Sequence, residues 1–113
     1  MKQGEIWQIC LDPAIGAEMK KNRPAIILNV DALGKLPLKI IAPITDWKEH
    51  YSEYPWMIKI SPTDENGLSK TSAIDCFQIR SVAVERLVSF IGLAGHRCVS
   101  EAQDAIAQVF GII

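Results

Sequence analysis

The chain has 113 residues, of which 49% are hydrophobic, and its formal net charge is −1. This length and composition predict one folded domain, residues 1–113, and exclude both a disordered chain and a broad basic surface for nucleic acid. No apolar run approaches the ~20 residues that a membrane span needs, and the N-terminus lacks the apolar stretch of a signal peptide. We therefore expect a cytoplasmic protein that does not associate with membranes.

Short apolar or alternating segments, separated by turn residues, run through the first 94 residues. Pro24 suits the first position of a strand, where no ladder donor is needed, and Pro43 interrupts or edges another strand. Residues 46–55 are polar and aromatic, and we expect a surface loop there, long enough to be functional. Residues 84–87 are suited to one helical turn. The expected strands, five or six in number, lie within residues 5–11, 24–30, 38–45, 56–61, 71–82 and 88–94.

From about residue 98, apolar residues recur at steps of three and four, as on an amphipathic helix. Ser100 and Gln103 have the spacing of a capping box near its start, and Gly111 is expected to end it. The recurring positions are Val99, Ala102, Ala105 or Ile106, and Val109 or Phe110. Strands followed by one C-terminal helix predict a mainly β fold, either a small, strongly bent sheet or a barrel, and argue against an alternating βαβ fold.

The chemistry-bearing residues exclude several common sites. The three cysteines (Cys10, Cys76 and Cys98) show no metal-ligand spacing, and their apolar surroundings indicate reduced, buried thiols. His50 and His96 are read as surface or capping residues, so no histidine acid–base pair is predicted. There is no phosphate-binding glycine loop and no zinc-protease or serine-hydrolase motif. We expect neither a metal nor a cofactor.

Two polar residues stand at the ends of apolar runs. Arg23 comes just before the run that starts at Pro24, and Thr45 closes the run "IIAPI". Ends of adjacent strands meet in a compact β fold, so these two residues are able to share one rim. The pattern leaves two interpretations open for each: a solvated charge or a residue that carries chemistry for Arg23, and a strand-end or turn hydroxyl or a residue that carries chemistry for Thr45.

The order of several short motifs resembles the MazF/PemK toxins of type II toxin–antitoxin systems. The first motif is "GEIWQICLDPAIGAEMKKNRP", and it is followed by "IIAPIT", "GLSKTSAID", "QIRSV" and "RLVSFIG". The matching residues of the first motif are Gly4, Glu5, Ile6, Trp7, Leu11, Asp12, Pro13, Gly16, Glu18, Arg23 and Pro24. Each motif alone is weak, but their order and spacing cover nearly the whole chain.

The resemblance implies an SH3-like barrel with a C-terminal helix, usually as a homodimer. It implies a metal-independent endoribonuclease that cuts single-stranded RNA at short sequences and is held inactive by a cognate antitoxin. The family's catalytic pair maps to Arg23 and Thr45. Attack of a ribose 2′-OH on the adjacent phosphate would build charge that a guanidinium and a hydroxyl can stabilise. The expected products carry a 2′,3′-cyclic phosphate and a 5′-OH, and DNA lacks the nucleophile.

The same resemblance suggests residues that bind RNA. These are Glu18, Lys20, Lys21, Asn22 and Gln78. Surface solubility remains an alternative for the two lysines, and a sheet-edge amide for Gln78. The aromatic residues flanking the long loop could stack an unpaired base, although packing is the favoured role of Trp56.

Two departures from the family pattern bear on cut-site choice and rate. Asn22 stands where some relatives carry a histidine near the arginine, and Phe77 stands where many carry an acid. The nearest acid, Asp75, lies two residues earlier. Two alternatives come from other functional classes: a toxin of the same fold that inhibits gyrase, and a degenerate member that only binds a partner.

Overall fold

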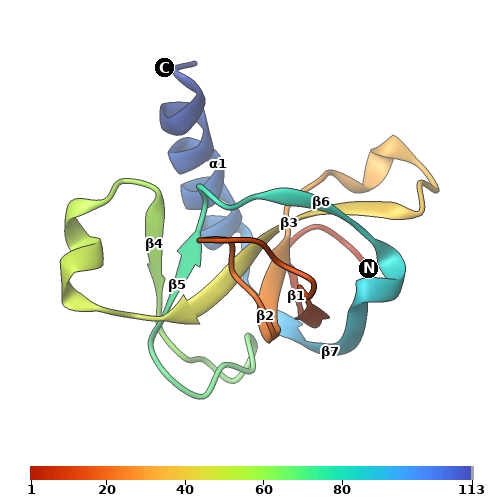
Figure 1. The fold of residues 1–113 in the computed structure, drawn as a ribbon, viewed down its shortest axis with the longest axis horizontal. Coiled ribbons are helices and arrows are strands. Elements are labelled where there is room, and N and C mark those ends of the chain that lie inside the picture. Colours follow the sequence, from red (N-terminus) through yellow and green to blue (C-terminus); the bar gives the residue numbers. More distant parts are fainter. Residues whose placement is uncertain (113) are drawn as a thin grey trace.

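A computed structural model describes residues 1–112, so Ile113, the last residue of the predicted domain, lies outside it. Seven strands are followed by one α-helix (Figure 1). The strands are β1 (Glu5–Cys10), β2 (Asn22–Ile27), β3 (Leu38–Asp46), β4 (Met57–Ile60), β5 (Ser72–Asp75), β6 (Arg80–Ala83) and β7 (Leu87–Leu93). The helix is α1 (His96–Phe110), and three short 3₁₀ turns cover Asp31–Leu33, Glu49–Glu53 and Val84–Arg86.

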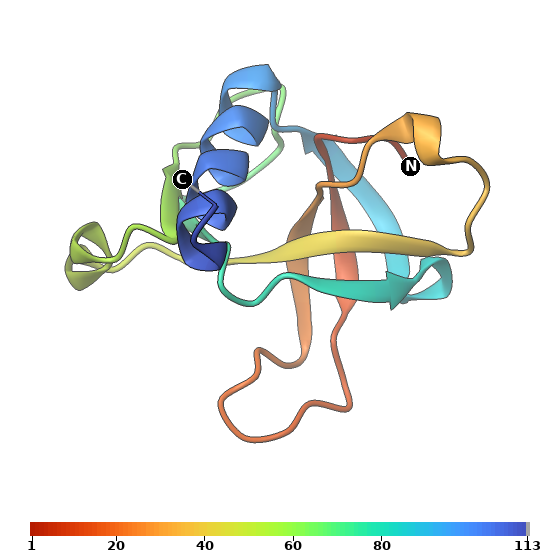
Figure 2. The same ribbon diagram turned by 90° about the horizontal axis from the view of Figure 1, so that it is seen from above.

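The strands form one antiparallel sheet in the order β4-β5-β3-β2-β1-β7, and β6 also pairs with β3. β3 and β6 run across the direction of β1 and β2 in Figure 2, which shows how strongly the sheet is bent. Within residues 1–112 no pairing joins β4 or β6 to β7. The predicted mainly β fold with a C-terminal helix is therefore confirmed, whereas strand pairing does not close the sheet into a barrel.

β3 is the longest strand, and its partner changes along one edge. Residues 38–41 pair with β6, and residues 44–46 pair with β5. Pro43 lies between these two ladders, and on the opposite edge it faces Ala25 of β2. The Leu28 N–H donates to the Ile40 carbonyl (2.9 Å). In an antiparallel ladder, hydrogen-bonded pairs of residues alternate with pairs that are not hydrogen-bonded to each other. Since Leu28 and Ile40 form a bonded pair, Ala25 and Pro43 form a non-bonded one, and the backbone nitrogen of Pro43, which carries no hydrogen, points away from β2 toward the gap between β5 and β6. The strand therefore contains a proline at its centre without losing a ladder bond.

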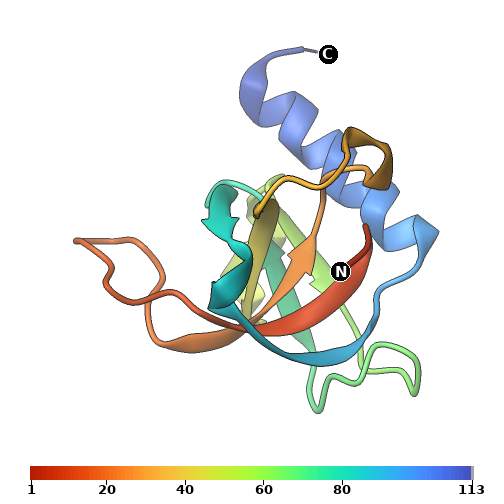
Figure 3. The same ribbon diagram turned by 90° about the vertical axis from the view of Figure 1, so that its right-hand side faces the viewer.

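The core consists of two clusters, one on each face of the central strands. Figure 3 shows α1 covering one face of the sheet. That face contributes Ile6, Ile26, Leu28, Ala42, Ile44, Ile60, Ile74 and Cys76, which pack with Val99, Ala102 and Ala105 of the helix. The other face contributes Ile9, Leu11, Ala25, Ile27, Ile41, Val82 and Leu87. Side chains at successive positions of β2 and β3 alternate between the two clusters, as the pleat of a strand requires.

Three details differ from the sequence-based prediction. The expected strand over residues 71–82 is two strands, because residues 76–79 turn the chain from one partner ladder of β3 to the other. The loop over residues 46–55 contains a 3₁₀ turn. The helix begins at His96 with Gly95 as its N-cap, so the predicted capping box at Ser100 and Gln103 is wrong.

The end of the helix agrees with the prediction. Gly111 adopts a left-handed conformation (φ 73°), and its N–H donates to carbonyls of the last helical turn. Val99, Ala102 and Ala105 face the sheet, as their spacing predicted. None of the helices in residues 1–112 combines the length and the apolar character that a bilayer crossing demands.

Burial controls the chemistry of two cysteines. All three cysteines are free thiols, and Cys76 is fully buried in the cluster beneath α1. Burial, with the nearby charges of Asp75 and Cys98, raises the pKa of the Cys76 thiol to about 12. Burial, together with Glu101, raises the pKa of the Cys98 thiol to about 11. Both side chains are therefore protonated over the whole range in which an ordinary thiol ionises.

We predict that Cys76 resists alkylation by iodoacetamide at pH 8 in the folded protein and reacts readily in guanidinium chloride. Because both folded pKa values are raised, unfolding should become easier as the pH rises above the ordinary thiol pKa of about 8.5. Mass spectrometry of labelled peptides at several pH values measures the first effect, and urea unfolding measures the second. Equal labelling of Cys76 in the folded and unfolded protein would contradict the prediction.

Candidate functional site

The register between β2 and β3 brings Arg23 and Thr45 together. Ala25 pairs with Pro43, and the same register continued by two residues places Arg23 opposite Thr45. Arg23 Nη1 donates a hydrogen bond to Thr45 Oγ1 (3.2 Å). Both side chains are half-buried and lie on the face of the sheet that carries the second core cluster. The two residues that the sequence allowed to share one rim are therefore in direct contact.

A second contact holds the guanidinium from the side of the loop. Arg23 Nε donates to the Lys20 carbonyl (3.0 Å). The guanidinium has five N–H donors, and these two bonds leave three without an acceptor among residues 1–112. The Thr45 hydroxyl accepts from Arg23 and keeps its own hydrogen to donate. The pair therefore presents several converging donors, which suits a phosphate group with more than one oxygen.

The loop that joins β1 to β2, residues 11–21 and here called the β1–β2 loop, carries most of the other predicted site residues. Lys20 and Lys21 are exposed, and Lys21 adopts a left-handed conformation (φ 68°). The Lys21 N–H donates to Asp12 Oδ1 (2.9 Å), which ties the two ends of the loop together. Asn22 is exposed at the start of β2, opposite Cys10. The loop thus presents two cations within three residues of Arg23.

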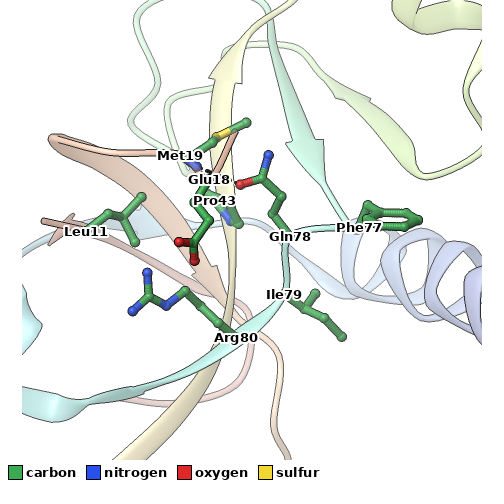
Figure 4. A pocket seen from close by; sticks show the side chains of 8 residues that line it. All are labelled: Leu11, Glu18, Met19, Pro43, Phe77, Gln78, Ile79 and Arg80. Atoms are coloured by element: carbon green, nitrogen blue, oxygen red, sulfur yellow. Dashed lines mark hydrogen bonds between the residues drawn. The ribbon is translucent and has the colours of Figure 1, made fainter. Parts of the chain in front are cut away.

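Glu18 and Gln78 face one pocket of about 340 Å³ beside the loop (Figure 4). Glu18 Oε1 accepts from the Ile15 N–H (2.9 Å) and stabilises the turn of its own loop. The close-up shows the Glu18 carboxylate and the Arg80 guanidinium directed toward the same space. The residues that line the pocket are Leu11, Glu18, Met19, Pro43, Phe77, Gln78, Ile79 and Arg80. Pro43 precedes Thr45 by two positions on the same face of β3, so the pocket adjoins the Arg23–Thr45 pair.

Gln78 has a structural contact at each end of its amide. Its Oε1 accepts from the Met19 N–H (2.7 Å), and its Nε2 donates to Asp75 Oδ2 (3.2 Å). Asp75 is 4% exposed, and its other oxygen accepts from the Phe77 N–H (3.0 Å). Burial raises the pKa of Asp75, and the hydrogen bonds from Phe77 and Gln78 partly offset that rise. The acid that the sequence left without a role therefore organises the turn between β5 and β6.

Three residues of this site were not singled out from the sequence as site residues. Arg80 lies at the pocket, and only its place in the motif "QIR" pointed to it. Arg86 Nη1 donates to the carbonyls of Cys10 (3.1 Å) and Asp12 (2.7 Å), and so holds the start of the β1–β2 loop. Met19 packs against the second core cluster. Arg86 is the first residue of the motif "RLVSFIG" and Met19 lies within the first motif, but neither motif gave them a role, because their partners are distant in the chain.

The aromatic residues of the long loop form a connected group. Tyr54 and Trp56 stack with their ring centroids 4.9 Å apart, and Trp56 meets Phe77 edge-on at 5.6 Å. Trp56 also packs against the first core cluster, as favoured for it from the sequence. His50 contacts Tyr51 and Tyr54, and His96 is exposed at the first position of α1. Residues 1–112 contain no group of three or more His, Cys, Asp or Glu residues that could hold a metal ion.

Comparison with known proteins places this geometry in a family. Residues 2–110 match the family model described as "PemK-like, MazF-like toxin of type II toxin-antitoxin system". The chain is 31% identical over 112 residues to endoribonuclease MazF9 of Mycobacterium tuberculosis (strain ATCC 25618 / H37Rv). That alignment covers 94% of this chain and 92% of the relative.

Solved structures share the fold. MazF from Deinococcus radiodurans superimposes with a TM-score of 0.81 at 20% identity, over 98% of this chain and 96% of that one. An endoribonuclease from a mycobacterial species, solved in complex with its cognate antitoxin, superimposes with a TM-score of 0.77 at 14% identity, over 100% and 97% of the two chains. The match over nearly the whole chain shows that this protein is a MazF/PemK-family endoribonuclease toxin of a type II toxin–antitoxin system.

Proposed function

We propose that the protein cuts single-stranded RNA at specific short sequences, without a metal ion, through attack of a ribose 2′-OH on the adjacent phosphate. The observation that carries this proposal is the contact between Arg23 and Thr45 at the rim of the sheet. In the reaction a bond forms between the 2′-oxygen and phosphorus, and the bond to the 5′-oxygen breaks. The 2′-OH gives up its proton, and the departing 5′-oxygen gains one. The products are a 2′,3′-cyclic phosphate and a 5′-OH.

Arg23 acts as an electrostatic catalyst in this proposal. Negative charge grows on the non-bridging oxygens as the 2′-oxygen attacks, and donors that are already oriented stabilise that charge without reorganising. The guanidinium is oriented by Thr45 and by the Lys20 carbonyl before RNA binds. A guanidinium is a poor base, so Arg23 is not assigned the proton transfer. The Thr45 hydroxyl donates to the same phosphate.

Specificity is assigned to the pocket beside the pair. Glu18 and Arg80 face the pocket with opposite charges, and Gln78 adds an amide to its wall. A carboxylate accepts from exocyclic amino groups and a guanidinium donates to carbonyl and ring nitrogen acceptors, so the two can select the edge of an unstacked base. Lys20, Lys21 and Asn22 are exposed along the approach to Arg23 and are assigned the flanking phosphates.

We also infer control by a cognate antitoxin that shields these same cations in the cytoplasm until the toxin is released. The mycobacterial relative solved with its antitoxin supports this inference by analogy of fold. Residues through Lys48 carry a net charge of about +2 and the remainder about −3. The cations of the first stretch include Lys20, Lys21 and Arg23 of the site, which attract an acidic segment.

We predict that Arg23→Ala lowers the cleavage rate of a single-stranded RNA by at least about 10²-fold, the usual cost of one lost charge-stabilising donor. The assay contains EDTA, and sequencing of the 5′ ends of the products reads the cut site. Arg97→Ala is the matched control, because Arg97 is exposed on α1 and, within residues 1–112, forms an ion pair only with Glu101. Undiminished cleavage by folded Arg23→Ala protein would overturn the assignment, and loss of wild-type activity in EDTA would overturn metal independence.

We further propose a homodimer formed through an exposed apolar patch. The patch consists of Leu33, Leu36, Leu38 and Ile40, which are between 43% and 64% exposed and line one shallow pocket of about 110 Å³. A contiguous group of exposed apolar side chains at one site is unusual for a monomer and typical of an interface.

Leu36→Glu is therefore expected to shift the protein from dimer to monomer, because it would bury a carboxylate in an apolar interface. Light scattering coupled to gel filtration measures the mass. Ile15→Glu is the control, since Ile15 is 81% exposed in the β1–β2 loop and lies outside the patch. A monomeric wild type, or a dimeric Leu36→Glu variant, would contradict this interface.

A further inference from the structure

The middle of the β1–β2 loop has one long-range hydrogen bond. Residues 13–20 bond to one another through Ile15 and Glu18, and to neighbouring β2 through the Lys20 carbonyl. Among the hydrogen bonds of residues 1–112, only the Met19 N–H to Gln78 Oε1 bond connects this segment to a distant part of the chain. It is also the shorter bond of the Gln78 amide, at 2.7 Å. The position of the loop therefore depends on Gln78 and on the packing of the Met19 side chain.

The buried carboxylate of Asp75 fixes which way the Gln78 amide points. An ionised carboxylate only accepts hydrogen bonds, so the Gln78 NH₂ group must face Asp75 Oδ2. This orientation leaves Gln78 Oε1 facing the Met19 N–H. The reverse orientation would set oxygen against oxygen at Asp75 and N–H against NH₂ at Met19. One buried acid thereby selects the amide orientation that can hold the loop.

The loop in turn holds Arg23. Met19 is followed by Lys20, whose carbonyl accepts from Arg23 Nε (3.0 Å), while Arg23 Nη1 bonds to Thr45 (3.2 Å). The contacts form a continuous series from Asp75 through Gln78, Met19 and Lys20 to the guanidinium. A displacement of the loop at Met19 moves the Lys20 carbonyl, and Arg23 then loses one of its two orienting partners.

We propose that Asp75 and Gln78 are positioning residues that latch the β1–β2 loop at Met19 and thereby set the Arg23 guanidinium against Thr45. The effect on cleavage rests on the function proposed above, whereas the latch itself exists without RNA. Asp75 is well suited to this task, because it is 4% exposed and forms none of the ion pairs of residues 1–112, so its hydrogen bonds are directed wholly to the turn and to Gln78.

Gln78→Met tests the latch, since it keeps the length of the side chain and removes both hydrogen bonds. We expect the Met19 amide to exchange with solvent about 3- to 10-fold faster, the range for the loss of one net hydrogen bond. Trypsin should cut faster after Lys20 and Lys21, and the Arg23 Nε–H signal in ¹⁵N NMR should lose protection. Gln103→Met is the control, because Gln103 is exposed on α1. Unchanged protection of both Met19 and Arg23 in Gln78→Met would overturn the proposal.

The joint role of the two residues is tested by a double-mutant cycle with Asp75→Asn, for which Asp104→Asn on the exposed face of α1 is the control. If Asp75 acts through Gln78, the double variant loosens the loop no more than Gln78→Met alone. Additive loosening would overturn the series of contacts. Should Asp75→Asn fail to fold, the outcome for Gln78→Met still decides the latch.

Cleavage then separates positioning from base recognition. A misplaced Arg23 lowers kcat by about 3- to 10-fold with KM little changed, because the interaction is made in the transition state. Altered cut sites with an unchanged loop would instead assign Gln78 to base reading and overturn its positioning role. If the loop loosens as expected but the wild type cuts no RNA, the latch is supported and the proposed function fails.

Discussion

The antiparallel register between β2 and β3 places Ala25 opposite Pro43, and by continuation Arg23 opposite Thr45. Because side chains alternate across a strand, a slip of one residue in this pairing would turn one of the two residues to the opposite face of the sheet. The register is held by the apolar pattern, since Ala25, Ile27 and Ile41 face one core cluster and Ile26 and Ala42 face the other. The same strand register that packs the core therefore also sets the geometry of the Arg23–Thr45 pair.

The pair is completed from outside the sheet. Arg23 lies at the start of β2, where the β1–β2 loop supplies the Lys20 carbonyl as a second partner for the guanidinium. That loop is held at its ends by Asp12 and Arg86 and near its last turn by Gln78. A side chain with many rotamers is thus ordered by contacts from two segments, the β1–β2 loop and β3. In the proposed reaction this order reduces the reorganisation needed when charge develops on a bound phosphate.

Much of this arrangement could be predicted from the sequence. The apolar runs located the strands, the three- and four-residue spacing located the buried face of α1, and Gly111 marked its end. Arg23 precedes one apolar run and Thr45 follows another, so the sequence allowed the two to share one rim, and in the structure they are in contact. The ordered motifs led to the family that the comparisons established. These features depend on residues that are close together in the sequence or that recur at a regular spacing, so periodicity and motif order are sufficient to predict them.

The parts that could not be predicted depend on distant partners. Gln78 and Met19 are 59 positions apart, and neither residue type indicates that an amide will hold that loop. In the sequence nothing distinguishes Asp75 from the other acidic residues, and only the structure shows that it is buried and organises the turn between β5 and β6. The helix begins at His96, before the predicted capping box at Ser100, because Gly95, with φ 90°, ends the preceding segment without a capping side chain. Strand pairing that leaves the sheet unclosed is likewise a property of the assembled chain.

The central claim is that Arg23 and Thr45 stabilise charge on a phosphate attacked by the neighbouring 2′-OH. The most direct measurement uses a mapped RNA substrate with a single 2′-deoxy substitution on the ribose immediately 5′ of the cut, with mass spectrometry of the product ends. We predict that this one substitution abolishes cutting there, and that the unmodified RNA yields 2′,3′-cyclic phosphate and 5′-OH ends. Cutting at the 2′-deoxy position, or a product with a 5′-phosphate, would contradict it.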